Sequence, residues 1–132
     1  RHDHIGYNYR MPNINAALGC AQLENLDRYV ADKRETAACY AEFFKGKEDI
    51  TFFTEPADCK SNYWLNAVVL KDKAAQLDFL EYTNDHGVMT RPVWELMNRL
   101  PMFEHCETDG LENTEWLADR VVNIPSSVRL DK

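Results

Sequence analysis

A single apolar repeat of helical period runs from Ile14 to Phe44, and no other feature restricts the fold of this chain as strongly. Its positions are Ile14, Leu18, Ala21, Leu26, Val30, Ala37, Tyr40 and Phe44. Pro12 and Asn13 mark the start, with either Asn13 as the N-cap or Pro12 in the first helical position. An unbroken helix over residues 13–45 would be ~50 Å long at about 1.5 Å per residue, which is long for one compact domain. We therefore expect its first half to pack against a surface outside this chain or on another subunit.

Beyond Gly46, short runs rich in β-branched and aromatic residues replace the helical repeat and predict strands. Strands are expected at residues 50–53, 63–70, 88–93 and 121–124. Between them we expect one helix capped by Asp72 and running to about residue 85, and another capped by Asn113 and running to about Arg120. The expected buried stripe of the first of these helices is Ala74, Leu77, Phe79 and Leu80.

The order helix, strand, strand, helix, strand, helix, strand predicts an α+β fold, with helices on one face of a small, mainly antiparallel sheet. We expect residues 1–45 to form an interface loop and a long connecting helix. Residues 46–132 are expected to form the small α+β domain.

Composition excludes several classes of function. A net charge of −7 argues against nucleic-acid binding, which depends on clustered Lys and Arg. No apolar run is long enough to cross a membrane. The four cysteines lack the paired spacing of zinc ligands, so we predict no metal site and free thiols in the cytoplasm. Because the chain does not begin with Met, we expect it to be part of a longer protein.

No familiar catalytic motif is present. The serines lack a GxSxG elbow, the histidines lack HExxH spacing, and the isolated glycines form no phosphate loop. We therefore assign no catalytic residue within this chain.

One segment is more informative, because residues 3–26 closely resemble a stretch of the DegT/StrS-type sugar aminotransferases. The matching pieces are GYNYRM at 6–11, NAALG at 15–19 and Gln22-Leu23. Looser similarity continues in GVMTRPVW at 87–94, which resembles the family's segment that returns to the active site, and in NIPSS at 123–127, which resembles its closing strand.

The resemblance implies the small C-terminal domain of an aspartate-aminotransferase-like fold and a homodimer with active sites at the subunit interface. Members of this family use pyridoxal phosphate to move an amino group, usually from glutamate, to a ketone on a nucleotide-linked sugar. The resemblance also implies that the Schiff-base lysine lies upstream of GYNYR, outside this chain. The fragment alone is therefore expected to be inactive and not to hold the cofactor.

Four residues are candidates for the site. The motif favours contact of Asn8 with the cofactor phosphate, ahead of a helix N-terminus; its alternative is a turn residue. Arg10 can pair with an anionic part of the substrate or form a structural salt bridge. Arg91 and Trp94 are candidates for contact with the sugar or nucleotide, although an Arg before Pro near a strand end can simply extend to solvent.

Two interpretations remain open. The first is the C-terminal part of a pyridoxal-phosphate-dependent aminotransferase acting on a nucleotide-linked keto-sugar, in surface-polysaccharide or amino-sugar biosynthesis. The second is a non-catalytic homologue that keeps this domain as a sugar-binding, regulatory or interaction module.

Overall fold

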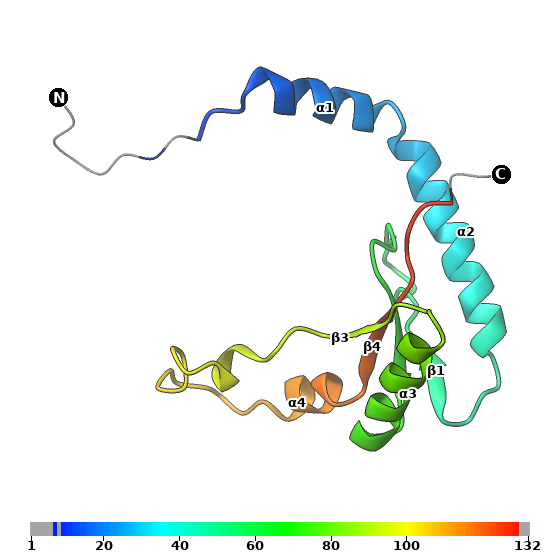
Figure 1. The fold of residues 1–132 in the computed structure, drawn as a ribbon, viewed down its shortest axis with the longest axis vertical. Helices are drawn as coiled ribbons and strands as arrows, with labels where there is room; N and C mark the ends of the chain where they lie inside the picture. The colour runs from blue at the N-terminus through cyan, green and yellow to red at the C-terminus, as the bar shows by residue number, and fades with distance from the viewer. Residues whose placement is uncertain (1–6, 8, 130–132) are drawn as a thin grey trace, which may run out of the picture.

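The computed structural model describes residue 7 and residues 9–129. In chain order the elements are α1 (Asn13–Leu23), α2 (Leu26–Phe44), β1 (Ile50–Phe52), β2 (Asn66–Leu70), α3 (Lys73–Asp85), β3 (Arg91–Pro92), the 3₁₀ helix η1 (Met97–Arg99), α4 (Glu112–Ala118) and β4 (Val121–Ile124). Figure 1 shows α1 reaching away from the sheet, while α2 and α3 lie against it. Within this part of the chain, no helix combines the length and the apolar character needed to cross a membrane.

The long helix predicted over residues 13–45 is broken into α1 and α2 at Glu24 and Asn25. Asn25 leaves helical geometry, with φ −108° and ψ 0°, and its Nδ2 donates to the Ala21 carbonyl at 3.1 Å. An Asn side chain that bonds nearby backbone competes with the helix ladder, which explains the break. The N-terminal alternatives are each wrong by one residue, because Pro12 occupies the cap position and Asn13 is the first helical residue.

The sheet is antiparallel throughout its described strands, in the order β1-β2-β4-β3. Val68 pairs with Phe52 on one side and with Val122 on the other, so these three side chains share a face. The prediction of an α+β fold with a small antiparallel sheet is confirmed.

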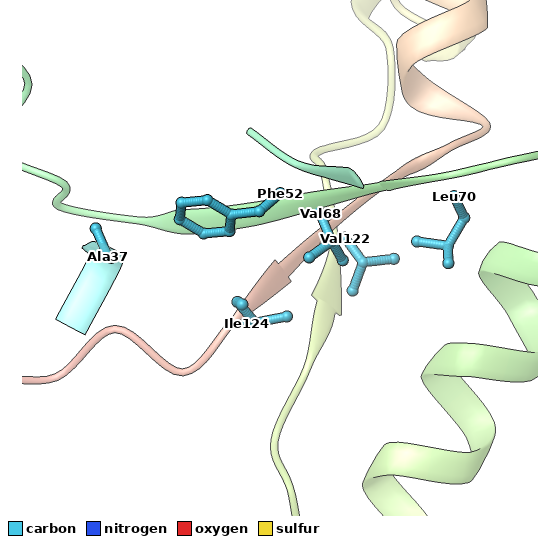
Figure 2. Close-up of a cluster of buried hydrophobic side chains, with 6 residues drawn as sticks. All are labelled: Ala37, Phe52, Val68, Leu70, Val122 and Ile124. Carbon is cyan, nitrogen blue, oxygen red and sulfur yellow. The ribbon is translucent and has the colours of Figure 1, made fainter. Parts of the chain in front are cut away.

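The core lies between that face of the sheet and the two helices α2 and α3. Figure 2 shows Ala37 of α2 in the same cluster as Phe52, Val68, Leu70, Val122 and Ile124. Ala75, Phe79 and Leu80 of α3 pack against this cluster. Val68 and Val122 are fully buried, and burying each such side chain stabilises the fold by ~1.5–3 kcal/mol.

α3 begins where predicted, because Asp72 Oδ1 accepts from the Ala75 N–H at 2.9 Å. Its buried face was predicted correctly for Phe79 and Leu80, which pack against the core, but not for the other two residues. Ala74 and Leu77 are exposed, whereas Gln76 is fully buried. Gln76 Nε2 donates to the carbonyls of Ala118 and Val121 at 2.9 and 2.8 Å. A buried amide whose hydrogen bonds are satisfied can occupy a core position, and a pattern of apolar residues does not identify such a position.

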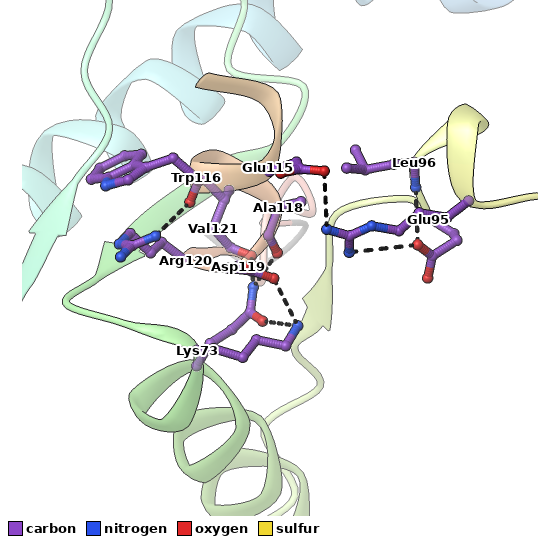
Figure 3. A network of polar contacts seen from close by, with 11 residues as sticks. Lys73, Glu95, Leu96, Glu115, Trp116, Ala118, Asp119, Arg120 and Val121 are labelled. Atoms are coloured by element: carbon purple, nitrogen blue, oxygen red, sulfur yellow. Dashed lines mark hydrogen bonds and ion pairs between the residues drawn. The ribbon is translucent and has the colours of Figure 1, made fainter. Parts of the chain in front are cut away.

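Polar contacts continue from α3 to α4 across the end of the sheet. Lys73 Nζ donates to Gln76 Oε1 at 2.8 Å and lies 3.7 Å from Asp119 Oδ1. Figure 3 shows Lys73 pointing toward Asp119, and Arg120 lying beside Trp116. Because the Lys73–Asp119 ion pair is partly exposed, it contributes little to stability.

Several predicted boundaries change for reasons visible in the backbone. α4 begins at Glu112, so Asn113 lies inside the helix and does not cap it. β2 begins at Asn66 and not at residue 63, because Tyr63 has φ +46°, in the left-handed region that a strand cannot include. β3 covers only Arg91 and Pro92: Pro92 has no N–H for further pairing, and Thr90, before the strand, is bonded to Asn84 of α3 instead.

Candidate functional site

A groove of about 870 Å³ opens at the end of the sheet where β3 and β4 meet. We call it the β3–β4 groove. Residues from several elements line it. They are Lys33 of α2, Trp64 and Leu65 before β2, Met89, Arg91 and Pro92 at β3, Trp94 after β3, and Asn123 to Ser127 at the end of β4. A second, more apolar groove of about 680 Å³ shares Trp94 as part of its wall.

The β3–β4 groove is positively charged within an acidic chain of net charge −7. Lys33 and Arg91 both line it, and no acidic residue does so among the residues that the structure describes. In residues 9–129, the single hydrogen bond of the Arg91 side chain joins Nη2 to Met89 Sδ at 3.3 Å. Sulfur is a weak acceptor. The Arg91 guanidinium therefore keeps most of its donors for an anionic ligand.

The structure brings Arg91 and Trp94, two of the predicted site residues, to this groove. The Trp94 side chain is 73% exposed, and that of Trp64, which lines the groove as well, is 65% exposed. Large aromatic side chains left uncovered in a concave surface are typical of binding sites. Trp64 was missed because the segment around it was interpreted only as a strand.

Lys33 was also missed as a site residue. Its ammonium donates to the Ser126 carbonyl at 2.5 Å and to the Trp64 carbonyl at 3.4 Å. Ser126 is held in turn by its own hydroxyl, which accepts from the Asn66 N–H and donates to the Ile124 carbonyl, both at 2.7 Å. No sequence signal marks this role, because the partners of Lys33 are main-chain carbonyls far along the chain.

The loop that leads to Trp64 is fastened to α2 by an ion pair. Arg34 meets Glu55 through both nitrogens of its fork, at 3.0 and 2.6 Å, and also donates to the Ser61 carbonyl at 2.6 Å. The hydrogen bond from Arg34, helped by the Ser61 N–H, lowers the pKa of Glu55 to about 2. Tyr63 completes the loop, since its hydroxyl accepts from the Glu55 N–H at 3.2 Å. This fastening sets the position from which Trp64 enters the groove.

Of the other two predicted site residues, the structure describes only Arg10, which is not among the residues that line this groove. Arg10 is exposed and lies in the stretch before α1. Asn8 lies outside the described residues, so its predicted contact with the cofactor phosphate stays a prediction.

Comparison with known proteins gives a consistent result. The model of the DegT/DnrJ/EryC1/StrS aminotransferase family matches residues 1–132. GDP-perosamine synthase from Escherichia coli O157:H7 is 32% identical over 127 residues, which are 95% of this chain and 34% of that protein. The putative pyridoxal phosphate-dependent aminotransferase EpsN of Bacillus subtilis strain 168 is 32% identical over 130 residues, 96% of this chain and 34% of that protein.

Solved structures agree on the fold. Sugar aminotransferase CalS13 from Micromonospora echinospora matches with a TM-score of 0.81 and 26% identity, over 96% of this chain and 33% of that one. The Helicobacter pylori aminotransferase PseC, involved in pseudaminic acid biosynthesis, matches with a TM-score of 0.85 and 21% identity, over 99% of this chain and 36% of that one. The predicted relation to the small domain of an aspartate-aminotransferase-like fold is thus confirmed, and the chain spans about a third of the relatives it matches. This chain belongs to the DegT/DnrJ/EryC1/StrS aminotransferase family.

Proposed function

We propose that the chain is the C-terminal part of a pyridoxal-phosphate-dependent aminotransferase that moves an amino group from an amino acid, glutamate, to a nucleotide-linked keto-sugar. Surface-polysaccharide or amino-sugar biosynthesis is the proposed context, and the cytoplasm the proposed location. The observation that carries the proposal is the β3–β4 groove. In a member of this family, it is lined by two cationic side chains, Lys33 and Arg91, and by two exposed tryptophans.

The chemistry of the groove fits the two ends of a nucleotide-linked sugar. The guanidinium of Arg91 offers a planar fork that suits phosphate oxygens. Trp64 and Trp94 offer apolar faces on which a base or a sugar ring can stack. Asn123 and Ser127, which also line the groove, supply side chains that can hydrogen-bond sugar hydroxyls.

The described residues do not form a complete site for pyridoxal phosphate. When bound, that cofactor supplies the electron sink for amino transfer. The lysine that lines the groove, Lys33, already donates to two carbonyls, which makes it a poor candidate for a Schiff base. We therefore propose that the chain alone is inactive, that the cofactor lysine belongs to another part of the protein, and that Asn8 contacts the cofactor phosphate.

We also propose a homodimer in which the N-terminal stretch contributes to the shared site, and Arg10 would contact the substrate there. Support comes from α1, which has no buried residue and exposes Ile14 and Leu18 at 81% and 61%. Exposed apolar surfaces of this kind mark contacts with other protein. The division into residues 1–45 and 46–132 remains our proposal, with α2 contributing Ala37 to the core of the second part.

The decisive experiment assays the intact protein with glutamate and a panel of nucleotide-linked 4-keto-sugars. Formation of an amino-sugar together with 2-oxoglutarate would support the proposal. Binding of a nucleotide sugar without turnover, in protein shown to be folded, would favour the non-catalytic sugar-binding homologue. Absence of both would reject the assignment of the groove.

A further inference from the structure

Lys33 occupies an unusual place for a lysine, in the middle of α2 and facing inward. It is partly buried, and it lies one helical turn before Ala37, which belongs to the core. Its ammonium donates to two main-chain carbonyls, those of Trp64 and Ser126. In the described residues it takes part in no ion pair, so its contacts are directed at the backbone.

These two carbonyls belong to two neighbouring segments that line the β3–β4 groove and continue the directly paired strands β2 and β4. Trp64 comes from the segment before β2, whereas Ser126 comes from the segment after β4. A carbonyl oxygen held by an ammonium fixes its peptide unit, and with it the direction of the attached side chain. Lys33 therefore ties both segments to α2.

Neighbouring contacts make this arrangement stiff. The Ser126 hydroxyl bridges the Asn66 N–H and the Ile124 carbonyl, so the segment after β4 is tied to β2 as well as to α2. The Tyr40 hydroxyl, two turns along α2 from Lys33, donates to the Pro125 carbonyl at 3.0 Å. A displacement of the Lys33 ammonium would therefore break or shift its hydrogen bonds to both Trp64 and Ser126.

The ammonium has three N–H donors, and two are used by these carbonyls. Lys33 itself lines the groove, so its charge adds to that of Arg91. We propose that Lys33 is a positioning residue of the β3–β4 groove: it fixes Trp64 and Ser126 against each other and places positive charge where an anionic ligand enters. Its effect on ligand binding rests on the proposed function, whereas its effect on the two segments does not.

Three variants of the full chain test this inference. Lys33→Met keeps the length of the side chain and removes the donors. Lys33→Arg keeps the charge and the donors. Lys45→Met is the matched control, since Lys45 follows the same helix and its ammonium, among the described residues, makes an exposed ion pair with Glu42 at 3.5 Å and no other.

The first readout is hydrogen exchange, followed by NMR at single amides. Lys33→Met should speed exchange of the Asn66 amide, which depends on Ser126, by roughly tenfold or more, because a lost charged hydrogen bond changes an equilibrium by at least that factor. Amides of α3 should keep the wild-type rate. Unchanged exchange at Asn66, or an equal acceleration throughout the core, would overturn the positioning role.

The second readout needs no variant. In the wild-type chain, Lys33 should react with acetic anhydride several times more slowly than Lys45, because its ammonium is held by carbonyls and partly buried. Equal rates would refute the inference even if Lys33→Met failed to fold.

The third readout is the Kd of GDP and of dTDP, measured by calorimetry. Lys33→Met should weaken binding roughly tenfold, Lys33→Arg by much less, and Lys45→Met not at all. If Lys33→Met binds as tightly as wild type, the charge of Lys33 does not contribute to ligand binding, and that part of the proposal is wrong. If the wild-type chain binds neither nucleotide, the proposed function of the groove fails, while the exchange data still decide whether Lys33 positions the two segments.

Discussion

Replacing Gln76 by Leu should destabilise the chain strongly, although it puts an apolar residue into the core. Gln76 is fully buried and donates to the carbonyls of Ala118 and Val121. Leucine has a similar volume but no donor, so these two acceptors lose their side-chain partner. Each unsatisfied buried group costs ~1–3 kcal/mol, so the two carbonyls together cost ~2–6 kcal/mol. With part of this offset by the added apolar surface, we expect a loss of about 2–4 kcal/mol.

For a chain of 132 residues, the entropy of unfolding scales to roughly 0.28 kcal/mol per degree, so the melting temperature should fall by about 7–14 °C. Urea unfolding monitored by circular dichroism gives the free energy directly. The matched control is Leu77→Ala, at the next position of the helix, where the side chain is 54% exposed. It should change stability by less than about 1 kcal/mol. If Leu77→Ala costs more than Gln76→Leu, the face of α3 that we describe as buried is wrong.

The remaining predictions concern charge, ligands and assembly. Because the pKa of Glu55 is about 2, against 4.5 for an unperturbed group, its stabilising effect is complete above about pH 4.5 and is lost as the pH falls toward 2. The difference in melting temperature between wild type and Glu55→Gln should therefore shrink over that window, and a constant difference would argue against it. In the intact protein, Arg91→Ala and Trp94→Ala should each lower kcat/KM for the nucleotide sugar by roughly tenfold to a hundredfold, as expected for a lost charged hydrogen bond or a lost aromatic contact. Asn8→Ala there should weaken cofactor binding by a similar factor, with Tyr9→Phe as the milder control; a lower melting temperature with unchanged affinity would make Asn8 a turn residue. The isolated chain should self-associate through α1, and a strict monomer in sedimentation experiments would contradict this.

The parts of the fold that the sequence predicted are those decided by local chemistry. Asp72 caps α3 through a contact three residues away, and β4 covers residues 121–124 as its β-branched run indicates. The break between α1 and α2 was missed because apolar periodicity continues across it, while the Asn25 side chain turns back on the preceding turn. The strand expected from residue 63 begins only at Asn66, because Tyr63 has a positive φ that its residue type does not predict.

The same distinction explains what was found of the candidate site. Arg91 and Trp94 were predicted because the 87–94 segment resembles its family over a continuous run, which a single sequence can display. Lys33 and Trp64 belong to the same groove, but their contact runs from a side chain to a main-chain carbonyl 31 residues away. Main-chain acceptors are the same at every residue, so no pattern of residue types can specify which carbonyl a lysine will meet. Only the packing of α2 on the sheet selects Trp64 and Ser126. For this reason, the groove contains both a part that sequence comparison can identify and a part that only the fold creates.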